Sequence, residues 1–225
     1  MVTSLSFSAF VSRRSADLPT KIEHMWRKSI LPVCVVSTAM SLAFGSFGIL
    51  SQRLAAQAQK ASSSTMADGK RWTTHNLDVN TMPSYCYENA DLNCRRYGRL
   101  YTWESAQRVC RSLGDGWRLP TDDEWRQLAK QYGGVSADAD DKGKAAYKAL
   151  LVGGSSGFDA LLGGGRSEDG QYARLEAHGF YWTASESDAA AAYYNFGRGG
   201  QALHRQNGGE KSKAFSVRCV RPTGP

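Results

Sequence analysis

One stretch of the chain, residues 97–128 (YGRLYTWESAQRVCRSLGDGWRLPTDDEWRQL), constrains the fold more than any other. Its first half predicts a helix, because Thr102 can serve as the N-cap, apolar residues then recur at helical spacing, and Gly114 is a natural C-terminal stop. Its second half predicts another helix that opens at Thr121, where Glu124 completes a capping box. Any fold of this chain must therefore bury two consecutive amphipathic helices.

The second half of the chain changes to a β-type pattern. Short aromatic and β-branched runs predict strands over residues 180–182, 193–196 and 215–219. Glycine-rich segments predict turns at 163–165 and 197–200, and residues 145–152 predict a third, shorter helix. Two main helices followed by mostly antiparallel strands indicate an α+β fold, with the helices packed on short sheets.

Four cysteines follow the N-terminal region, and their even number favours disulfides. They are Cys86, Cys94, Cys110 and Cys219, which allow three connectivities. The close spacing of the first two suits a local bridge, and Cys110 on the first helix would then pair with Cys219 on the last strand. That bridge would close a loop of ~109 residues, worth about 4–5 kcal/mol in the chain-entropy model. A zinc site is the alternative, although zinc sites usually contain a close C-x-x-C pair, which is missing here.

An uncharged apolar segment, residues 29–50 (SILPVCVVSTAMSLAFGSFGIL), precedes these elements. At about 1.5 Å per residue, a helix of that length spans roughly 33 Å, enough to cross a bilayer. The basic region before it predicts a cytoplasmic N-terminus. The Ala56-x-Ala58 pattern after it is typical of signal-peptidase sites. The segment is therefore either an uncleaved single-pass membrane anchor or a cleaved signal peptide, and both export the rest of the chain.

The net charge of +7 is unevenly distributed. Residues 1–58 carry six Lys and Arg against two Asp and Glu, whereas residues 59–225 carry 22 against 19. Nucleic-acid readers concentrate basic residues on the folded part, so we expect no nucleic-acid partner. The resulting division is a basic cytoplasmic region (1–28), an anchor or signal peptide (29–58), a linker (59–67) and a folded domain (68–225).

Five segments resemble one family in order and with natural spacing. They are DGKRWTTHNLDV (68–79), SYCYENADLNCRRYGRLYTWESA (84–106), GWRLPTDDEW (116–125), GFYWTASESD (179–188) and AFSVRCVRP (214–222). They resemble the fibrobacter major paralogous domain, a family similar to the C-type lectin fold and to the formylglycine-generating-enzyme-like group. The resemblance implies a C-type-lectin-like fold, in which a cysteine of the first helix pairs with one in the last strand. This supports a Cys110–Cys219 bridge.

The resemblance also implies an exported surface protein that binds a ligand without catalysis. Some relatives resemble the variable targets of diversity-generating retroelements, whose exposed residues near the last strands bind the ligand. Carried onto this chain, that surface is residues 185–213. Its candidate contact residues are Tyr193, Tyr194, Asn195, Arg198, Gln201, His204, Arg205, Gln206 and Asn207. Tyrosine offers a large contact area, and Asn, Gln and Arg add adaptable hydrogen bonds. Tyr194 and Phe196 can alternatively belong to the core.

Two other classes stay open, an oxidase or hydrolase of the formylglycine-generating-enzyme-like group and a structural envelope protein. That oxidase group uses a close cysteine pair before the final strand, where this chain has Cys219 alone. Asp138, Asp140 and Asp141 have oxygen ligands suited to Ca²⁺, but we expect them to form a solvated loop. We therefore predict no cofactor and no metal. The expected partner is a protein or glycan ligand, with the membrane as a second partner if residues 29–50 stay uncleaved.

Overall fold

The computed structural model describes residues 61–224. The basic N-terminal region, the apolar segment 29–50 and the Ala56-x-Ala58 pattern lie outside the described residues. Among residues 61–224, no helix is both long enough and apolar enough to cross a membrane.

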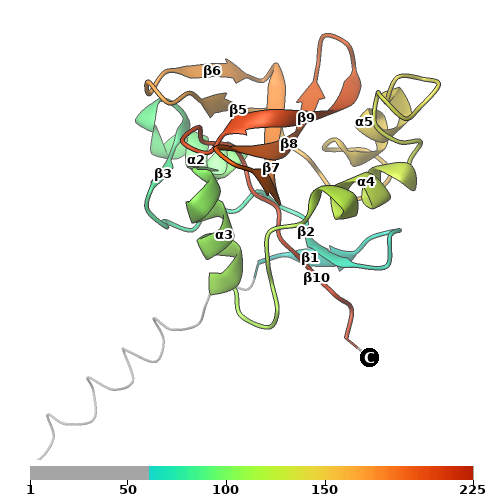
Figure 1. The fold of residues 1–225 in the computed structure, drawn as a ribbon, viewed down its shortest axis with the longest axis horizontal. Helices are drawn as coiled ribbons and strands as arrows, with labels where there is room; N and C mark the ends of the chain where they lie inside the picture. The colour runs from blue at the N-terminus through green and yellow to red at the C-terminus, as the bar shows by residue number, and fades with distance from the viewer. Residues whose placement is uncertain (1–60, 225) are drawn as a thin grey trace, which may run out of the picture. The chain divides into compact units, whose positions relative to one another are not determined.

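The described residues form a mixed α+β fold, as predicted (Figure 1). Its helices are η1 (Tyr87–Asn89, 3₁₀), α2 (Asp91–Tyr97), α3 (Trp103–Ser112), α4 (Asp122–Lys130) and α5 (Lys144–Leu150). Its strands are β1 (Ser63–Thr65), β2 (Arg71–Thr73), β3 (Ser84–Tyr85), β4 (Leu100–Tyr101), β5 (Gly163–Arg166), β6 (Tyr172–Leu175), β7 (His178–Ser187), β8 (Ala190–Gly197), β9 (Ala202–Glu210) and β10 (Val220–Arg221).

The strands form three sheets. The largest has five strands in the order β6-β5-β7-β8-β9 and is antiparallel except for the β5–β7 pair. The others are β1-β2-β10 and β3-β4. Neighbouring side chains of β7 point to opposite faces of the sheet and belong to different hydrophobic clusters, since side chains alternate across a strand. Tyr181 packs with Trp125 and Leu128 of α4, whereas Trp182 packs with Val109 of α3. Helices α4 and α3 therefore cover different parts of the large sheet (Figure 1).

The two helices predicted from residues 97–128 are confirmed as α3 and α4. The Thr121–Glu124 capping box is present, with both reciprocal hydrogen bonds. Burial opposes ionisation of Glu124, but its hydrogen bonds with Arg118 and the Thr121 backbone outweigh burial and lower its pKa. Thr102 occupies the N-cap of α3, but its hydroxyl contacts Ser105 Oγ at 3.1 Å instead of a helix backbone N–H. The predicted third helix is confirmed as α5.

Three sequence expectations need correction, and one helix was not predicted. Helix α2 was missed, because its sequence, DLNCRRY, is short and polar. Residues 163–165 form strand β5 and not a turn. Within residues 215–219, Phe215 and Ser216 make single bridges, and the last regular strand is β10, which begins at Val220. The expected linker contains β1, which pairs with β2, so the folded part begins before residue 68.

Residues 214–221, which we call the closing segment, touch all three sheets. Ala214 exchanges backbone hydrogen bonds with Arg166 of β5, and Phe215 does so with Tyr101 of β4. Ser216 donates to the carbonyl of Phe180 in β7. Strand β10 then pairs with β2 (Figure 1). The three sheets are therefore joined through one short piece of chain.

Both predicted disulfides are confirmed. Cys86–Cys94 ties η1 to α2, with Cα atoms 4.9 Å apart. Cys110–Cys219 ties α3 to the closing segment, with a Cα separation of 5.5 Å. Both separations lie in the normal range for disulfides. Stable disulfides are typical of oxidising compartments outside the cytoplasm.

Arg218, in the closing segment, is fully buried. Its guanidinium donates to the backbone carbonyls of Thr73 (3.0 Å), Phe158 (2.6 Å) and Asp159 (2.6 Å) and to Asn76 Oδ1 (2.8 Å). It also lies 4.6 Å from the centroid of the Phe158 ring. Burial lowers the pKa of Arg218, but an arginine keeps its proton in proteins. Four oxygens and an aromatic face thus take the place of a carboxylate partner.

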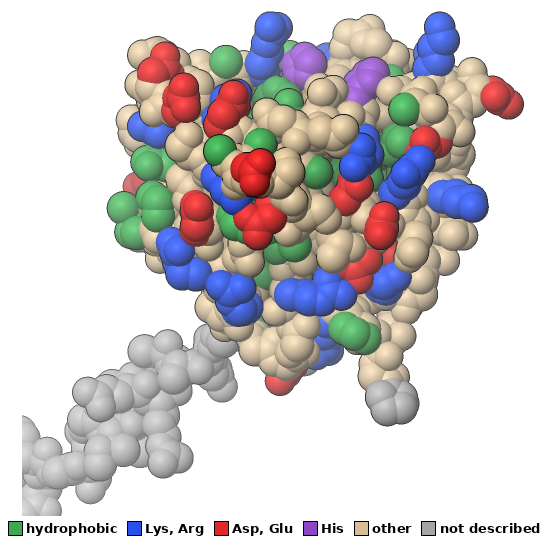
Figure 2. Space-filling view, in the orientation of Figure 1, with side chains coloured by type: hydrophobic (Ala, Val, Ile, Leu, Met, Phe, Trp, Pro, Cys, Tyr) green, Lys and Arg blue, Asp and Glu red, His purple; other side chains and the backbone are tan. Residues whose placement is uncertain are grey.

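On the face viewed in Figure 2, basic and acidic side chains are intermixed, and hydrophobic side chains are scattered or in small groups. This mixture agrees with the near balance of 22 basic and 19 acidic residues after residue 58. That face therefore carries no extended field of one sign.

We predict that Arg218→Met lowers the free energy of unfolding by at least ~3 kcal/mol, because each buried acceptor left without a donor costs about 1–3 kcal/mol. Urea unfolding with the disulfides intact measures the change. Arg95→Met is the control, since Arg95 is exposed on α2 and should shift the value by less than about 0.5 kcal/mol. Equal effects of the two substitutions would contradict the role given to Arg218.

Candidate functional site

The predicted contact residues lie on β8, on β9 and on the turn between them. Register pairs Tyr193 with Gln206, Tyr194 with Arg205, and Asn195 with His204. Residues directly opposite each other point to the same face of a sheet. The pairs of Tyr193 and Asn195 therefore share one face, and Tyr194 and Arg205 share the other. The sequence places these residues on adjacent strands, but only the register divides them into two sets.

Tyr194 belongs to the core and not to a contact surface. It is fully buried, and its ring stacks on Trp125 of α4 with centroids 5.0 Å apart and planes at 17°. Its hydroxyl donates to Asp122 Oδ1 at 3.1 Å. Burial, followed by the charge of Asp122, raises the pKa of Tyr194 far above its ordinary value. Its inclusion among the ligand-contacting residues is therefore wrong.

Arg205 is also committed to the scaffold. Its Nε lies 2.7 and 2.8 Å from the two carboxylate oxygens of Asp122, and one terminal nitrogen lies 2.6 Å from Oδ2. The Asp122 side chain is 11% exposed and that of Arg205 is 31% exposed. The hydrogen bond to Asp122 raises the pKa of Arg205. The guanidinium thus neutralises a nearly buried carboxylate, a role that the sequence did not indicate.

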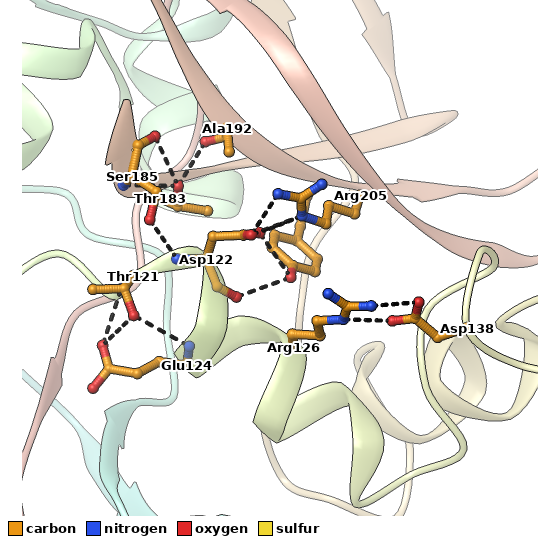
Figure 3. Close-up of polar contacts among 10 residues, drawn as sticks. Thr121, Asp122, Glu124, Arg126, Asp138, Thr183, Ser185, Ala192 and Arg205 are labelled. Atoms are coloured by element: carbon orange, nitrogen blue, oxygen red, sulfur yellow. Dashed lines mark hydrogen bonds and ion pairs between the residues drawn. The ribbon is translucent and has the colours of Figure 1, made fainter. Parts of the chain in front are cut away.

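The first turn of α4 is attached to the sheet around Asp122, as Figure 3 shows. The backbone N–H of Asp122 donates to Ser185 Oγ at 3.0 Å. Thr183 Oγ1 in turn donates to the carbonyl of Ala192 and accepts from the backbone of Ser185. These contacts join α4 to β7, β8 and β9. The network around Asp122 is therefore a structural joint.

The other face carries a group of half-buried polar side chains. Asn195 Oδ1 lies 2.9 Å from His178 Nδ1 on β7. His204 Nδ1 lies 2.8 Å from Ser136 Oγ. Gln206 lies opposite Tyr193 and is exposed. The structure thus brings together four of the predicted contact residues on this face: Tyr193, Asn195, His204 and Gln206.

Three aromatic rings, Phe180, Tyr193 and Phe215, form what we call the aromatic shelf. Phe215 lies 5.1 Å from Phe180 and 5.0 Å from Tyr193, measured between ring centroids. Phe215 is buried at the bottom, whereas Phe180 and Tyr193 are half-buried. Burial raises the pKa of Tyr193, which favours its neutral hydroxyl further. The shelf offers apolar ring surface to a ligand.

A hollow of about 200 Å³ opens beside the shelf. Its lining consists of Gly165, Arg166, Ser167, Gln171, Ala173, Arg174, Phe180, Tyr193, Lys213 and Phe215. A Cβ atom at Gly165 would lie 3.1 Å from both Phe180 and Phe215, so a larger residue there would press on the shelf. Among these residues the sequence analysis named Tyr193 as a contact residue, and Lys213 lies at the end of the predicted surface 185–213. The others come from β5, β6 and the turn between them, from β7 and from the closing segment, which only tertiary pairing brings together.

The remaining predicted contact residues are exposed positions of the β8–β9 hairpin. Arg198 and Gln201 are in the turn between β8 and β9, and Asn207 is on β9. All three are exposed, and Gln201 has a φ of 49°. None of them lines the hollow. They are accessible to solvent, but they contribute no contact surface to the hollow.

Two of the three acidic residues near position 140, Asp138 and Asp141, have separate partners. Asp138 pairs with Arg126 at 2.7 Å (Figure 3), and this hydrogen bond lowers its pKa. Asp141 accepts from the backbone N–H groups of Gly143 and Ala145 at the start of α5. Within residues 61–224, no group of three His, Cys, Asp or Glu side chains is arranged to hold a metal ion.

A larger hollow, of about 840 Å³, runs along α5. Its lining mixes Asp141 with Lys144 and Lys148 and includes one aromatic residue, Tyr147. The hollow beside the aromatic shelf is smaller, but it combines several rings with charged side chains of one sign. Binding sites generally combine apolar surface with a few placed polar groups. We therefore take the smaller hollow as the candidate site.

A family model described as Fibrobacter succinogenes major domain matches residues 58–221. No curated protein and no solved structure matches the chain. The match covers all the strands and helices described above.

We predict that Arg205→Ala destabilises the domain by about 1–3 kcal/mol, because it leaves the nearly buried Asp122 carboxylate without its cation. Gln206→Ala, on the neighbouring exposed position, should change the free energy of unfolding by less than about 0.5 kcal/mol. Thermal unfolding of both variants measures the difference. A destabilised Gln206→Ala protein beside an unchanged Arg205→Ala protein would contradict the division of β9 into a scaffold face and a contact face.

Proposed function

The chain belongs to the Fibrobacter succinogenes major domain family, and on this premise we propose that its folded part is an exported, non-enzymatic recognition domain. We propose a C-type-lectin-like fold for it, with a rigid frame that presents a ligand-binding face on β7, β8 and β9. The observation that carries the proposal is the aromatic shelf, in which Phe180 and Tyr193 are half-buried over the buried Phe215 and lie beside polar and basic residues.

The frame is well braced beneath this face. Asp122, Tyr194 and Arg205 fix one side of the sheet, and Phe215 is held by paired backbone hydrogen bonds to Tyr101. Binding groups held on rigid elements lose little conformational freedom when a ligand arrives. A frame of this kind would tolerate substitution of exposed residues without loss of the fold, as a variable binding protein requires.

The cysteine pairing supports recognition over oxidase chemistry. Cys219, the cysteine nearest the end of the chain, is joined to Cys110 in a fully buried bridge. Its neighbour Arg218 is likewise committed to backbone carbonyls. Both side chains hold the fold together. The disulfides also support the proposed export, because they need an oxidising compartment to persist.

We predict that Tyr193→Ala weakens binding of the full-length protein to its glycan-array ligands at least tenfold, since half-exposed tyrosines are frequent binding hot spots. Tyr132→Ala is the matched control, because Tyr132 is also half-buried but packs against the core around α4 and α5. Near-ultraviolet circular dichroism verifies the fold of each variant. Array binding that survives Tyr193→Ala, or that is lost equally in a folded Tyr132→Ala protein, would overturn the proposal.

A further inference from the structure

Asn207 is the only asparagine of this chain that is followed by glycine. The other five asparagines precede Leu, Thr, Ala, Cys or Phe. In an Asn-Gly pair, the backbone nitrogen of the glycine reaches the side-chain carbonyl carbon of the asparagine most easily, because no Cβ atom shields that nitrogen or restricts the backbone. The reaction between these two groups therefore depends on whether the fold leaves them free to meet.

The pairing of β9 with β8 is interrupted at this dipeptide. The register shifts between Ala191 and Tyr193 of β8, so that Asn207 and Gly208 together lie opposite Ala192. A β-bulge of this kind leaves a residue unpaired and disrupts the ladder of hydrogen bonds locally. Asn207 and Gly208 are therefore held less firmly than residues of a regular strand.

The outer side of β9 is also open at this point. Strand β9 is at one edge of the five-stranded sheet. Near its start this edge is occupied, because Leu203 donates to the Gly143 carbonyl and accepts from the Ser136 N–H. Asn207 and Gly208 lie beyond this attachment, and both are exposed. Local rearrangement of their backbone therefore costs little free energy compared with unfolding of the domain.

The two glycines that follow Asn207 differ in their surroundings. A Cβ atom at Gly209 would lie 2.7 Å from the Trp182 ring, so packing excludes a larger residue there. A Cβ atom at Gly208 would meet no described atom within 4 Å, and the φ of Gly208 lies outside the left-handed region. Packing therefore does not require glycine at position 208, and the space beside its backbone is open.

We propose that Asn207 is a site of spontaneous deamidation in the folded protein. The Gly208 nitrogen loses its proton and bonds to Cγ of Asn207, the Cγ–Nδ2 bond breaks, and ammonia takes up a proton and leaves a succinimide ring. Water then opens the ring at either carbonyl and gives aspartate or isoaspartate, with no oxidant or reductant involved. Both products place a carboxylate among the predicted contact residues, and isoaspartate also inserts a methylene group into the β9 backbone.

The test is incubation of the native, oxidised full-length protein at mildly alkaline pH, followed by peptide mapping with mass spectrometry that separates aspartate from isoaspartate. We expect both products at position 207, formed about tenfold or more faster than at Asn80, which is exposed but precedes threonine. The rate should rise with pH, because the Gly208 nitrogen must lose its proton.

Gly208→Ala is the matched variant. It should slow the conversion of Asn207 about tenfold or more, because the added Cβ atom restricts the approach of the nitrogen. The near-ultraviolet circular dichroism should stay unchanged, since alanine fits the open space at this position.

A synthetic peptide of residues 202–213 gives the rate in an unfolded chain. If conversion needed global unfolding, the native protein would react slower than the peptide by the unfolding equilibrium constant, roughly a thousandfold or more. We expect a native rate within about a hundredfold of the peptide rate, because opening at the bulge is local.

Three outcomes overturn the inference. They are a native rate below that range, equal conversion of Asn207 and Asn80, and a folded Gly208→Ala protein that is converted as fast as the wild type. None of these measurements uses a ligand, so such a result leaves the proposed recognition function untouched.

Discussion

The closing segment, residues 214–221, is the element on which the rest of the domain depends. Its backbone bridges β4, β5 and β7, and β10 pairs with β2, so every sheet is tied to it. The side chains of two consecutive residues, Arg218 and Cys219, hold it in place. Arg218 satisfies four oxygens in the interior, and Cys219 is bonded to α3. A buried cation without a carboxylate is tolerable only because those oxygens converge on it.

The same segment connects the fold to the candidate site. Phe215 is both a strand-like bridge residue paired with Tyr101 and the bottom ring of the aromatic shelf. Ala214, one position earlier, holds the backbone of Arg166 through two hydrogen bonds. The floor and one basic residue of the hollow are therefore fixed by contacts that also join the sheets. The contacts that stabilise the domain therefore also make this site rigid.

Local sequence signals predicted what local interactions determine. The spacing of Trp103, Val109 and Cys110 and the Thr121–Glu124 capping box are short-range patterns, and α3 and α4 follow from them. Both disulfides were predictable from their number, spacing and family resemblance. Strand β5 was not, because its sequence, GGGR, has no β propensity and forms a strand only through its neighbours.

The division of the site was equally hidden. Alternation along β8 and β9 separates Tyr193 from Tyr194 and Gln206 from Arg205, but the sequence alone does not say which set faces the core. The burial of Arg218 was also unpredicted, because arginine is rarely interior and its acceptors are mainly backbone carbonyls from distant loops. Features that depend on long-range geometry required the structure.

Amide hydrogen exchange of the native, oxidised protein tests the role of the closing segment most directly. The amides of Phe215, Ser216, Cys219 and Val220 all donate to partners in other elements. We expect these amides to exchange only through global unfolding, with the same free energy as the amides of β7 and β8. Exchange of these four amides through a separate, lower-energy opening, while β7 and β8 stay protected, would show that the segment is an attachment and not the joint of the domain.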